Sequence, residues 1–161
     1  MLVLCTGNSA RSILGEVILN TRGAGRIAAF SAGSQPKGAV HPGALRLLAT
    51  LGIDAAGLHS KSWNVFTGPD APPIDLVITV CGSAAGETCP VFPGAPLRAH
   101  WGLPDPAAVH CDDVAVDAAF EQTWAWLDMR IGALLDLPFE TMEHAELQSR
   151  LDAIGQMEGA A

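Results

Sequence analysis

The sequence lacks several features that would direct it to a membrane or to nucleic acid. It contains no run of about eighteen apolar residues, and its N-terminus lacks the basic and then apolar pattern of a signal peptide, so we expect neither a membrane span nor secretion. Basic residues are scarce, since nine Lys plus Arg stand against seventeen Asp plus Glu, giving a formal net charge of −8. Because such a surface repels polyanions, we expect no nucleic-acid or membrane partner. From the lack of a span or signal peptide we expect a cytoplasmic protein.

Cysteine is scarce as well, with four residues at irregular spacing among 161. A secreted disulfide scaffold would need a denser framework, so we expect thiols at rest whose purpose is catalysis or metal binding. The chain is 49% hydrophobic and long enough for one core. We therefore expect a single domain over 1–155, followed by a weakly ordered tail over 156–161.

Strand and helix patterns alternate along the chain. Short apolar or β-branched runs predict strands over 1–4, 26–31 and 75–81, with a short fourth strand over 97–101. Amphipathic spacing and stop signals predict helices over 11–20, 41–51, 112–135 and 142–154. Such alternation is typical of an α/β domain with a four-stranded parallel sheet and helices on both faces. Ligands bind outside the carboxyl ends of such strands, where Cys5 and Cys81 would meet.

The segment from Cys5 to Arg11 has five intervening residues, Thr6, Gly7, Asn8, Ser9 and Ala10. A loop of this length between a strand and a helix can curl its N–H groups around a tetrahedral anion, and the helix N-terminus and a guanidinium add positive charge. The same field would favour a thiolate at Cys5, to which the Ser12 hydroxyl could donate. The alternative is a packing cysteine at a strand end, but the strand, loop and helix context favours a nucleophile in an oxyanion loop.

The sequence around this loop resembles the low-molecular-weight tyrosine phosphatase superfamily, and in particular its arsenate reductase branch. The resemblance covers nearly the whole chain to about Ile154 and continues through the segments Ser31-Ala-Gly33-Ser, His41-Pro-Gly-Ala-Leu, Ser60-Lys-Ser-Trp63, Thr79-Val-Cys81, Glu87-Thr-Cys89-Pro and Ala99-His-Trp101-Gly-Leu-Pro-Asp105-Pro. It implies a phosphatase-like fold, that is, a flavodoxin-like three-layer sandwich. It also implies reduction of arsenate to arsenite as an arsenic detoxification enzyme, with phosphate and sulfate as substrate analogues.

Asp105 lies between two prolines, which limit the backbone freedom of its loop. An Asp-Pro pair by itself indicates a turn. The resemblance implies that Asp105 is the general acid that protonates the leaving oxygen. Relatives that act on phosphotyrosine follow this pair with tyrosines that stack on the substrate, whereas Ala107 and Ala108 follow here and the sequence has no Tyr.

Cys81 and Cys89 are separated by seven residues after the third predicted strand. They could resolve a Cys5–arsenic adduct in turn, leaving a Cys81–Cys89 disulfide and a regenerated Cys5, provided that the segment bends until the Cα atoms lie within about 7 Å. Two packing cysteines or a zinc site are alternatives, but paired ligand spacing is absent and we expect no metal. Cys111 we interpret as a spare residue near a helix start.

The resemblance implies no tightly bound cofactor. It implies reduction by thioredoxin or by glutathione and glutaredoxin, and a weakly held monovalent cation near Glu16, where Asn8 and Ser31 shape the loop and Asn64 removes a charge. We expect a monomer. A phosphatase hydrolysing phosphate monoesters without the redox relay is the main alternative function, and a non-catalytic oxyanion sensor is a third. Gly15 is unexplained inside a predicted helix, where glycine costs about 1 kcal/mol relative to Ala.

Overall fold

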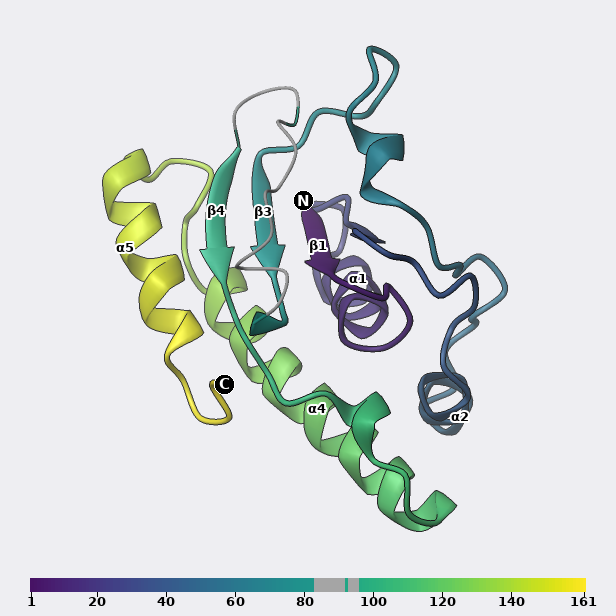
Figure 1. Ribbon diagram of the computed structural model, residues 1–161. Helices are drawn as coiled ribbons and strands as arrows, with labels where there is room; N and C mark the ends of the chain where they lie inside the picture. Colours follow the sequence, from purple (N-terminus) through teal and green to yellow (C-terminus); the bar gives the residue numbers. More distant parts are fainter. Residues whose placement is uncertain (83–91, 93–95) are drawn as a thin grey trace.

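The computed structural model describes residues 1–82, 92 and 96–161 (Figure 1). A four-stranded sheet occupies its centre, with all pairs parallel and the strand order β2-β1-β3-β4. The strands are β1 (Leu2–Cys5), β2 (Phe30–Gly33), β3 (Leu76–Thr79) and β4 (Leu97–His100). The predicted single α/β domain with a four-stranded parallel sheet is therefore confirmed.

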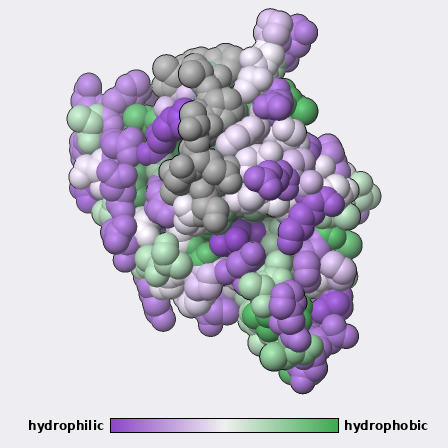
Figure 2. Space-filling view, in the orientation of Figure 1, coloured by the Kyte–Doolittle hydropathy of each residue, from purple (hydrophilic) through white to green (hydrophobic). Residues whose placement is uncertain are grey.

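The helices follow the predicted order with small shifts at their ends. They are α1 (Arg11–Arg22), α2 (Pro42–Thr50), α4 (Asp113–Leu135) and α5 (His144–Gly155), joined by the short 3-10 helices η1 (Trp63–Phe66) and η2 (Pro106–Ala108). Within the described part of the chain, none of them is long and apolar enough to cross a membrane. The visible face mixes hydrophilic and hydrophobic residues (Figure 2).

The prediction of a strand over 26–31 is wrong at its beginning, because β2 starts at Phe30. Arg26 instead lies in a turn, where its N–H bonds the Gly23 carbonyl. Its guanidinium pairs with Glu140 and lies over the Phe139 ring, so this residue faces the loop before α5 rather than a sheet neighbour. The register begins only where Phe30 pairs with Leu2.

Two separate clusters of side chains cover the two faces of the sheet. Alternate strand residues such as Val3 and Ile78 pack against α1, α4 and α5 in the larger core cluster. Leu2, Leu4 and Val77 point to the other face, where they meet a smaller cluster that includes Phe66 of η1. Because both sets are buried, β1 is apolar throughout and β3 is apolar up to its last residue, Thr79, as expected for inner parallel strands.

The centre of the sheet places the two relevant cysteines together. β1 lies between β2 and β3. The chain passes from β1 to β2 on one side of it, and β3 is then added on the other side. The carboxyl ends of strands on either side of such a reversal form a crevice. Cys5 ends β1, and Cys81 follows β3, with the Val80 N–H bonded to the Leu4 carbonyl at 2.9 Å.

The C-terminal segment 156–161, which the sequence predicts to be a weakly ordered tail, makes hydrogen bonds to the rest of the fold. The buried Arg130 guanidinium donates to the carbonyls of Met157 and Glu158. The Ala161 N–H bonds the Gly102 carbonyl at 3.0 Å, just beyond β4. A buried arginine of α4 and the turn after β4 thus contact this glycine-containing segment.

Gly15 is explained by the packing of α1 on β1. A Cβ at this buried position would lie 3.1 Å from a Val3 methyl, so the glycine permits a close approach of helix and strand. We expect Gly15→Leu to lower the free energy of unfolding by about 1–3 kcal/mol through overpacking. Urea denaturation checks this value, with Gly57→Leu as the control because a Cβ at Gly57 meets no atom within 4 Å. Equal stability of the two variants would contradict the packing explanation.

Candidate active site

A cavity of about 430 Å³ lies at the carboxyl ends of β1 and β3. Its lining comprises Cys5, Thr6, Gly7, Ser9, Ala10, Arg11, Gln35, Lys37, Cys81 and Asp105. The fold thus brings together the predicted nucleophile, the loop, the guanidinium, one of the two further thiols and the carboxylate. Cys89 lies outside the described residues. Cys111 is exposed and does not line the cavity.

The loop between Cys5 and Arg11 is held from its outer side. Its carbonyls at Thr6, Gly7 and Ser9 accept hydrogen bonds of 2.8–2.9 Å from the backbone N–H groups of Gln35, Lys37 and His41. A peptide plane that turns its oxygen outward turns its N–H in the opposite direction. The amides following these carbonyls therefore face the interior of the loop, where they can bind an anion together with the N-terminus of α1.

Asn8 ties the loop to the elements behind it. Its backbone has a φ of 40°, in the left-handed region that Asn tolerates better than most residues, and its N–H lies 3.3 Å from Cys5 Sγ. The side-chain amide donates to the hydroxyls of Ser12 and Ser31 at 2.9 Å each. Its oxygen accepts from the Lys61 N–H at 2.8 Å. This fully buried residue fixes both the curl of the loop and the orientation of Ser12, whose hydroxyl lies 3.3 Å from Cys5 Sγ.

Arg11 closes the cavity opposite the loop. One terminal nitrogen donates to the Leu103 carbonyl at 2.7 Å, and the other lies 3.2 Å from an Asp105 oxygen. Its Nε is buried and makes no hydrogen bond with the described residues, so it is a donor still to be satisfied. Asp105 is half exposed and accepts the Ala107 N–H at the start of η2, which fixes its carboxylate at the mouth of the cavity.

The thiols of Cys5 and Cys81 are both buried and are neighbours in the lining of this cavity. The neighbouring Cys81 thiol, followed by burial, raises the pKa of Cys5 well above the usual thiol value, while the Ser12 hydroxyl and the Asn8 N–H lower it. The net shift of the Cys5 pKa is upward, so the prediction that the loop favours a thiolate is wrong. The reason is Cys81, which follows β3 and which the sequence next to Cys5 does not reveal.

Glu16 is already paired with a cation from the chain itself. Its carboxylate accepts the Ser31 hydroxyl and lies 3.6 Å from Lys61 Nζ, with both charged side chains about 15% exposed. Ser31 in turn accepts from Asn8, so the ion pair supports the nucleophile loop. An ammonium thus lies at the carboxylate where the resemblance implied a weakly held monovalent ion.

Two lining residues, Gln35 and Lys37, were missed by the sequence interpretation. Both follow β2, and the carboxyl end of a strand adjacent to β1 is where such residues could have been sought. The predicted strand over 26–31 ended too early to point to them. Their backbone N–H groups also hold the loop, so they contribute to its shape as well as to the lining.

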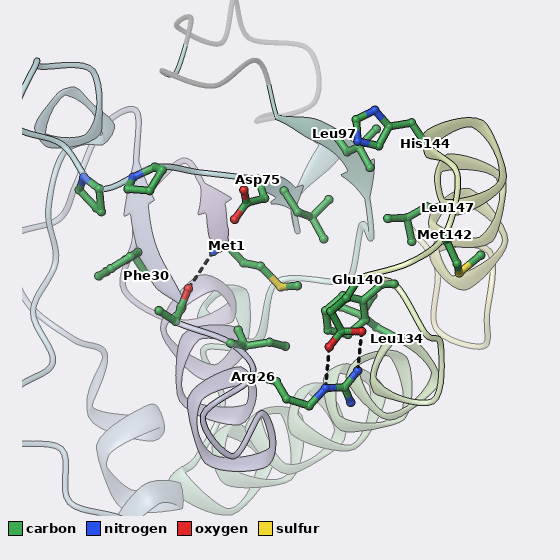
Figure 3. Close-up of a pocket in the computed structure, with 16 residues that line it drawn as sticks. Met1, Arg26, Phe30, Asp75, Leu97, Leu134, Glu140, Met142, His144 and Leu147 are labelled. Atoms are coloured by element: carbon green, nitrogen blue, oxygen red, sulfur yellow. Dashed lines mark hydrogen bonds and ion pairs between the residues drawn. The ribbon is translucent and has the colours of Figure 1, made fainter.

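A second cavity of about 550 Å³ lies at the opposite, amino-terminal edge of the sheet (Figure 3). Apolar side chains such as Phe30 and Leu147 surround most of it, and the guanidinium of Arg26 at its rim is occupied by Glu140. Its described lining holds no cysteine, and no three potential metal ligands cluster among the residues whose placement is described. The cavity at Cys5 is therefore the candidate active site.

Comparisons with known proteins agree with this location. A sequence profile of the low molecular weight phosphotyrosine protein phosphatase family matches residues 1–150. The chain is 32% identical over 123 residues to the arsenate reductase of Bacillus subtilis, covering 76% of this chain and 80% of that protein. The crystal structure of the Archaeoglobus fulgidus arsenate reductase superposes with a TM-score of 0.65 at 26% identity, over 84% of this chain and 98% of that one. An arsenate reductase in the phosphate binding state gives a TM-score of 0.62 at 29% identity, over 83% and 94% of the two chains.

The proximity of the two thiols has a measurable consequence. Because Cys81 is the largest cause that raises the pKa of Cys5, we expect Cys81→Ala to shift the alkylation of Cys5 by iodoacetamide to lower pH. Mass spectrometry of the Cys5 peptide across a pH series gives the midpoint. Cys111→Ala is the control and should leave it unchanged, since that thiol is exposed and does not line the cavity. A midpoint that stays constant or rises in Cys81→Ala would refute the assignment.

The ion pair behind the loop predicts a specific rescue. Lys61→Met leaves the Glu16 carboxylate without its ammonium, and we expect a loss of about 1–3 kcal/mol in unfolding free energy. Potassium chloride should stabilise this variant more than tetramethylammonium chloride does at equal ionic strength, because only the smaller ion fits against the carboxylate. The matched control is Arg150→Met, which breaks an exposed pair with Glu146. Identical salt responses in both variants would contradict the role given to Lys61.

Proposed function

The chain belongs to the low molecular weight phosphotyrosine protein phosphatase family, alongside members named arsenate reductases, and we propose that it reduces arsenate to arsenite. The observation that carries this proposal is that Cys5 and Cys81 are buried neighbours in one cavity, which the loop from Cys5 to Arg11 also lines. A phosphatase requires one nucleophilic sulfur. A second thiol beside the first is what a reductive release of arsenic requires.

Binding uses the loop amides and Arg11. The amides of residues 6–11 hold the oxygens of a tetrahedral anion, and the Arg11 guanidinium offers its buried Nε. Phosphate and sulfate share the geometry and charge of arsenate and bind as analogues. A relative of similar fold was solved in a phosphate binding state, which supports this assignment.

The first chemical step forms a bond from sulfur to arsenic. The Cys5 thiol gives its proton to an oxygen of the arsenate dianion. The resulting thiolate, its charge held by the Asn8 N–H and the Ser12 hydroxyl, attacks arsenic in the loop. An arsenic–oxygen bond breaks, and the departing hydroxyl takes a proton from Asp105 and leaves as water. Asp105 is placed for this role because its carboxyl group stands at the mouth of the cavity, and it carries the proton once its ion pair with Arg11 opens.

The second step transfers two electrons. The Cys81 thiolate attacks Cys5 sulfur, a sulfur–sulfur bond forms, and the sulfur–arsenic bond breaks with its electron pair remaining on arsenic. Pentavalent arsenic becomes trivalent and leaves as arsenite, while the two thiols are oxidised to a disulfide. The position of Cys81 beside Cys5 in the same cavity supports this step, because the attacking sulfur is a neighbour of its target.

Cys89 completes the relay by exchanging with the Cys5–Cys81 disulfide. Its thiolate attacks Cys81 sulfur, which returns Cys5 as a thiolate and leaves a Cys81–Cys89 disulfide. A dithiol donor, either thioredoxin or glutathione with glutaredoxin, then reduces that disulfide. No tightly bound cofactor takes part, since all the electrons come from thiols. The cycle fits a monomeric cytoplasmic enzyme of arsenic detoxification.

Hydrolysis of phosphate monoesters is the second candidate, because Cys5, Arg11 and Asp105 suffice for it. The family match supports this activity. The absence of tyrosine from the sequence and the small residues Ala107 and Ala108 after Asp105 weigh against an aromatic phosphate ester as the natural substrate.

Replacement of Cys81 separates the two functions. We expect Cys81→Ser to lower arsenite formation by on the order of 100-fold or more, because the adduct on Cys5 then lacks its resolving thiol. Slow hydrolysis of p-nitrophenyl phosphate should persist in this variant, since it needs no second sulfur. Arsenite production coupled to a thiol donor is the measurement, with Cys111→Ser as the control that should match the unmodified protein. If Cys81→Ser keeps full arsenate reduction, the relay does not operate.

A further inference from the structure

The candidate active site has a positive charge outside the loop from Cys5 to Arg11, on Lys37. Arg11 contributes one positive charge to the cavity, but Asp105 lies 3.2 Å from it and offsets that charge. Any thiolate at Cys5 or Cys81 adds a negative charge. Among the described lining residues, Lys37 supplies the remaining positive charge, and it makes no ion pair with the part of the chain that the structure describes.

Lys37 is placed over the loop by backbone and side-chain contacts. Its N–H donates to the Gly7 carbonyl at 2.9 Å, and the next residue, Gly38, has a φ of 81° and donates to the Ser60 hydroxyl. The lysine stem runs above Gly7, where a Cβ would lie 3.3 Å from Lys37 Cε and 3.4 Å from its Cγ. Glycine at position 7 therefore leaves the space along which this side chain reaches the cavity.

We propose that Lys37 binds the substrate oxyanion and selects its dianionic form, an inference that rests on the proposed function. Coulomb attraction to a single ammonium is about twice as strong for a dianion as for a monoanion at the same distance. Hydrogen bonds from the loop amides distinguish the two forms less, since both present oxygens of similar geometry. Lys37 is thus a binding residue for a doubly charged tetrahedral anion, whereas the amides select shape.

Equilibrium anion binding tests this role without any redox chemistry. The probes are sulfate, a tetrahedral dianion, and perchlorate, a tetrahedral monoanion, measured by calorimetry at low ionic strength. We expect Lys37→Gln to weaken sulfate by about 5- to 10-fold and perchlorate by about 2- to 3-fold. Lys37→Arg should retain most of the sulfate affinity, because it keeps the charge. The control Arg150→Gln removes an exposed charge outside the cavity and should change neither.

Each other result overturns the proposal. Equal losses for sulfate and perchlorate would indicate a general disturbance of the loop, and no loss would show that the ammonium does not reach the anion. Unchanged sulfate binding with weaker use of the thiol donor would assign Lys37 to a partner surface instead. The test stands apart from the proposed function, because sulfate selectivity can hold in a protein that makes no arsenite, and arsenite formation can persist without the selectivity.

Discussion

The site depends on the direction in which the peptide groups of one loop are turned. The carbonyls of Thr6, Gly7 and Ser9 are bonded on the outer side by the segment that follows β2. The amides are thereby left toward the centre, where an anion can replace the water that would otherwise solvate them. Asn8 holds this arrangement from behind with its left-handed backbone and buried side-chain amide. The proposed binding of an anion between the Cys5 sulfur and the Arg11 guanidinium depends on this orientation.

The proximity of Cys81 to Cys5 has two opposing consequences. The neighbouring Cys81 raises the pKa of Cys5, which favours the thiol over the thiolate. In the proposed reduction of arsenate, Cys81 would supply the second sulfur that a two-electron transfer requires. Ser12 and Asn8 donate to the same sulfur and partly offset the rise. If the proposed function holds, the site combines a less ionised Cys5 with a second thiol close at hand.

Basic side chains gather at the candidate site although the protein as a whole is acidic. The formal net charge of −8 disfavours anions over most of the surface. At the site, however, Lys61 offsets the Glu16 carboxylate behind the loop, and Arg11 faces the cavity from the other side. Lys37 adds a charge at the mouth. These basic residues come from three separate segments that meet only because β1 lies in the middle of the sheet.

By itself the sequence determined the order of strands and helices, the oxyanion loop from Cys5 to Arg11, and the meeting of Cys5 with Cys81 at strand ends. These features follow from local periodicity and from the rule that parallel strands share one functional edge. Tertiary structure decided the start of β2 at Phe30, the fit of Gly15 against Val3, the raised pKa of Cys5 and the presence of Lys37 in the lining. Each of these depends on atoms brought together across the sheet, and neither strand register nor the burial of one side chain by another is encoded in the spacing of nearby residues.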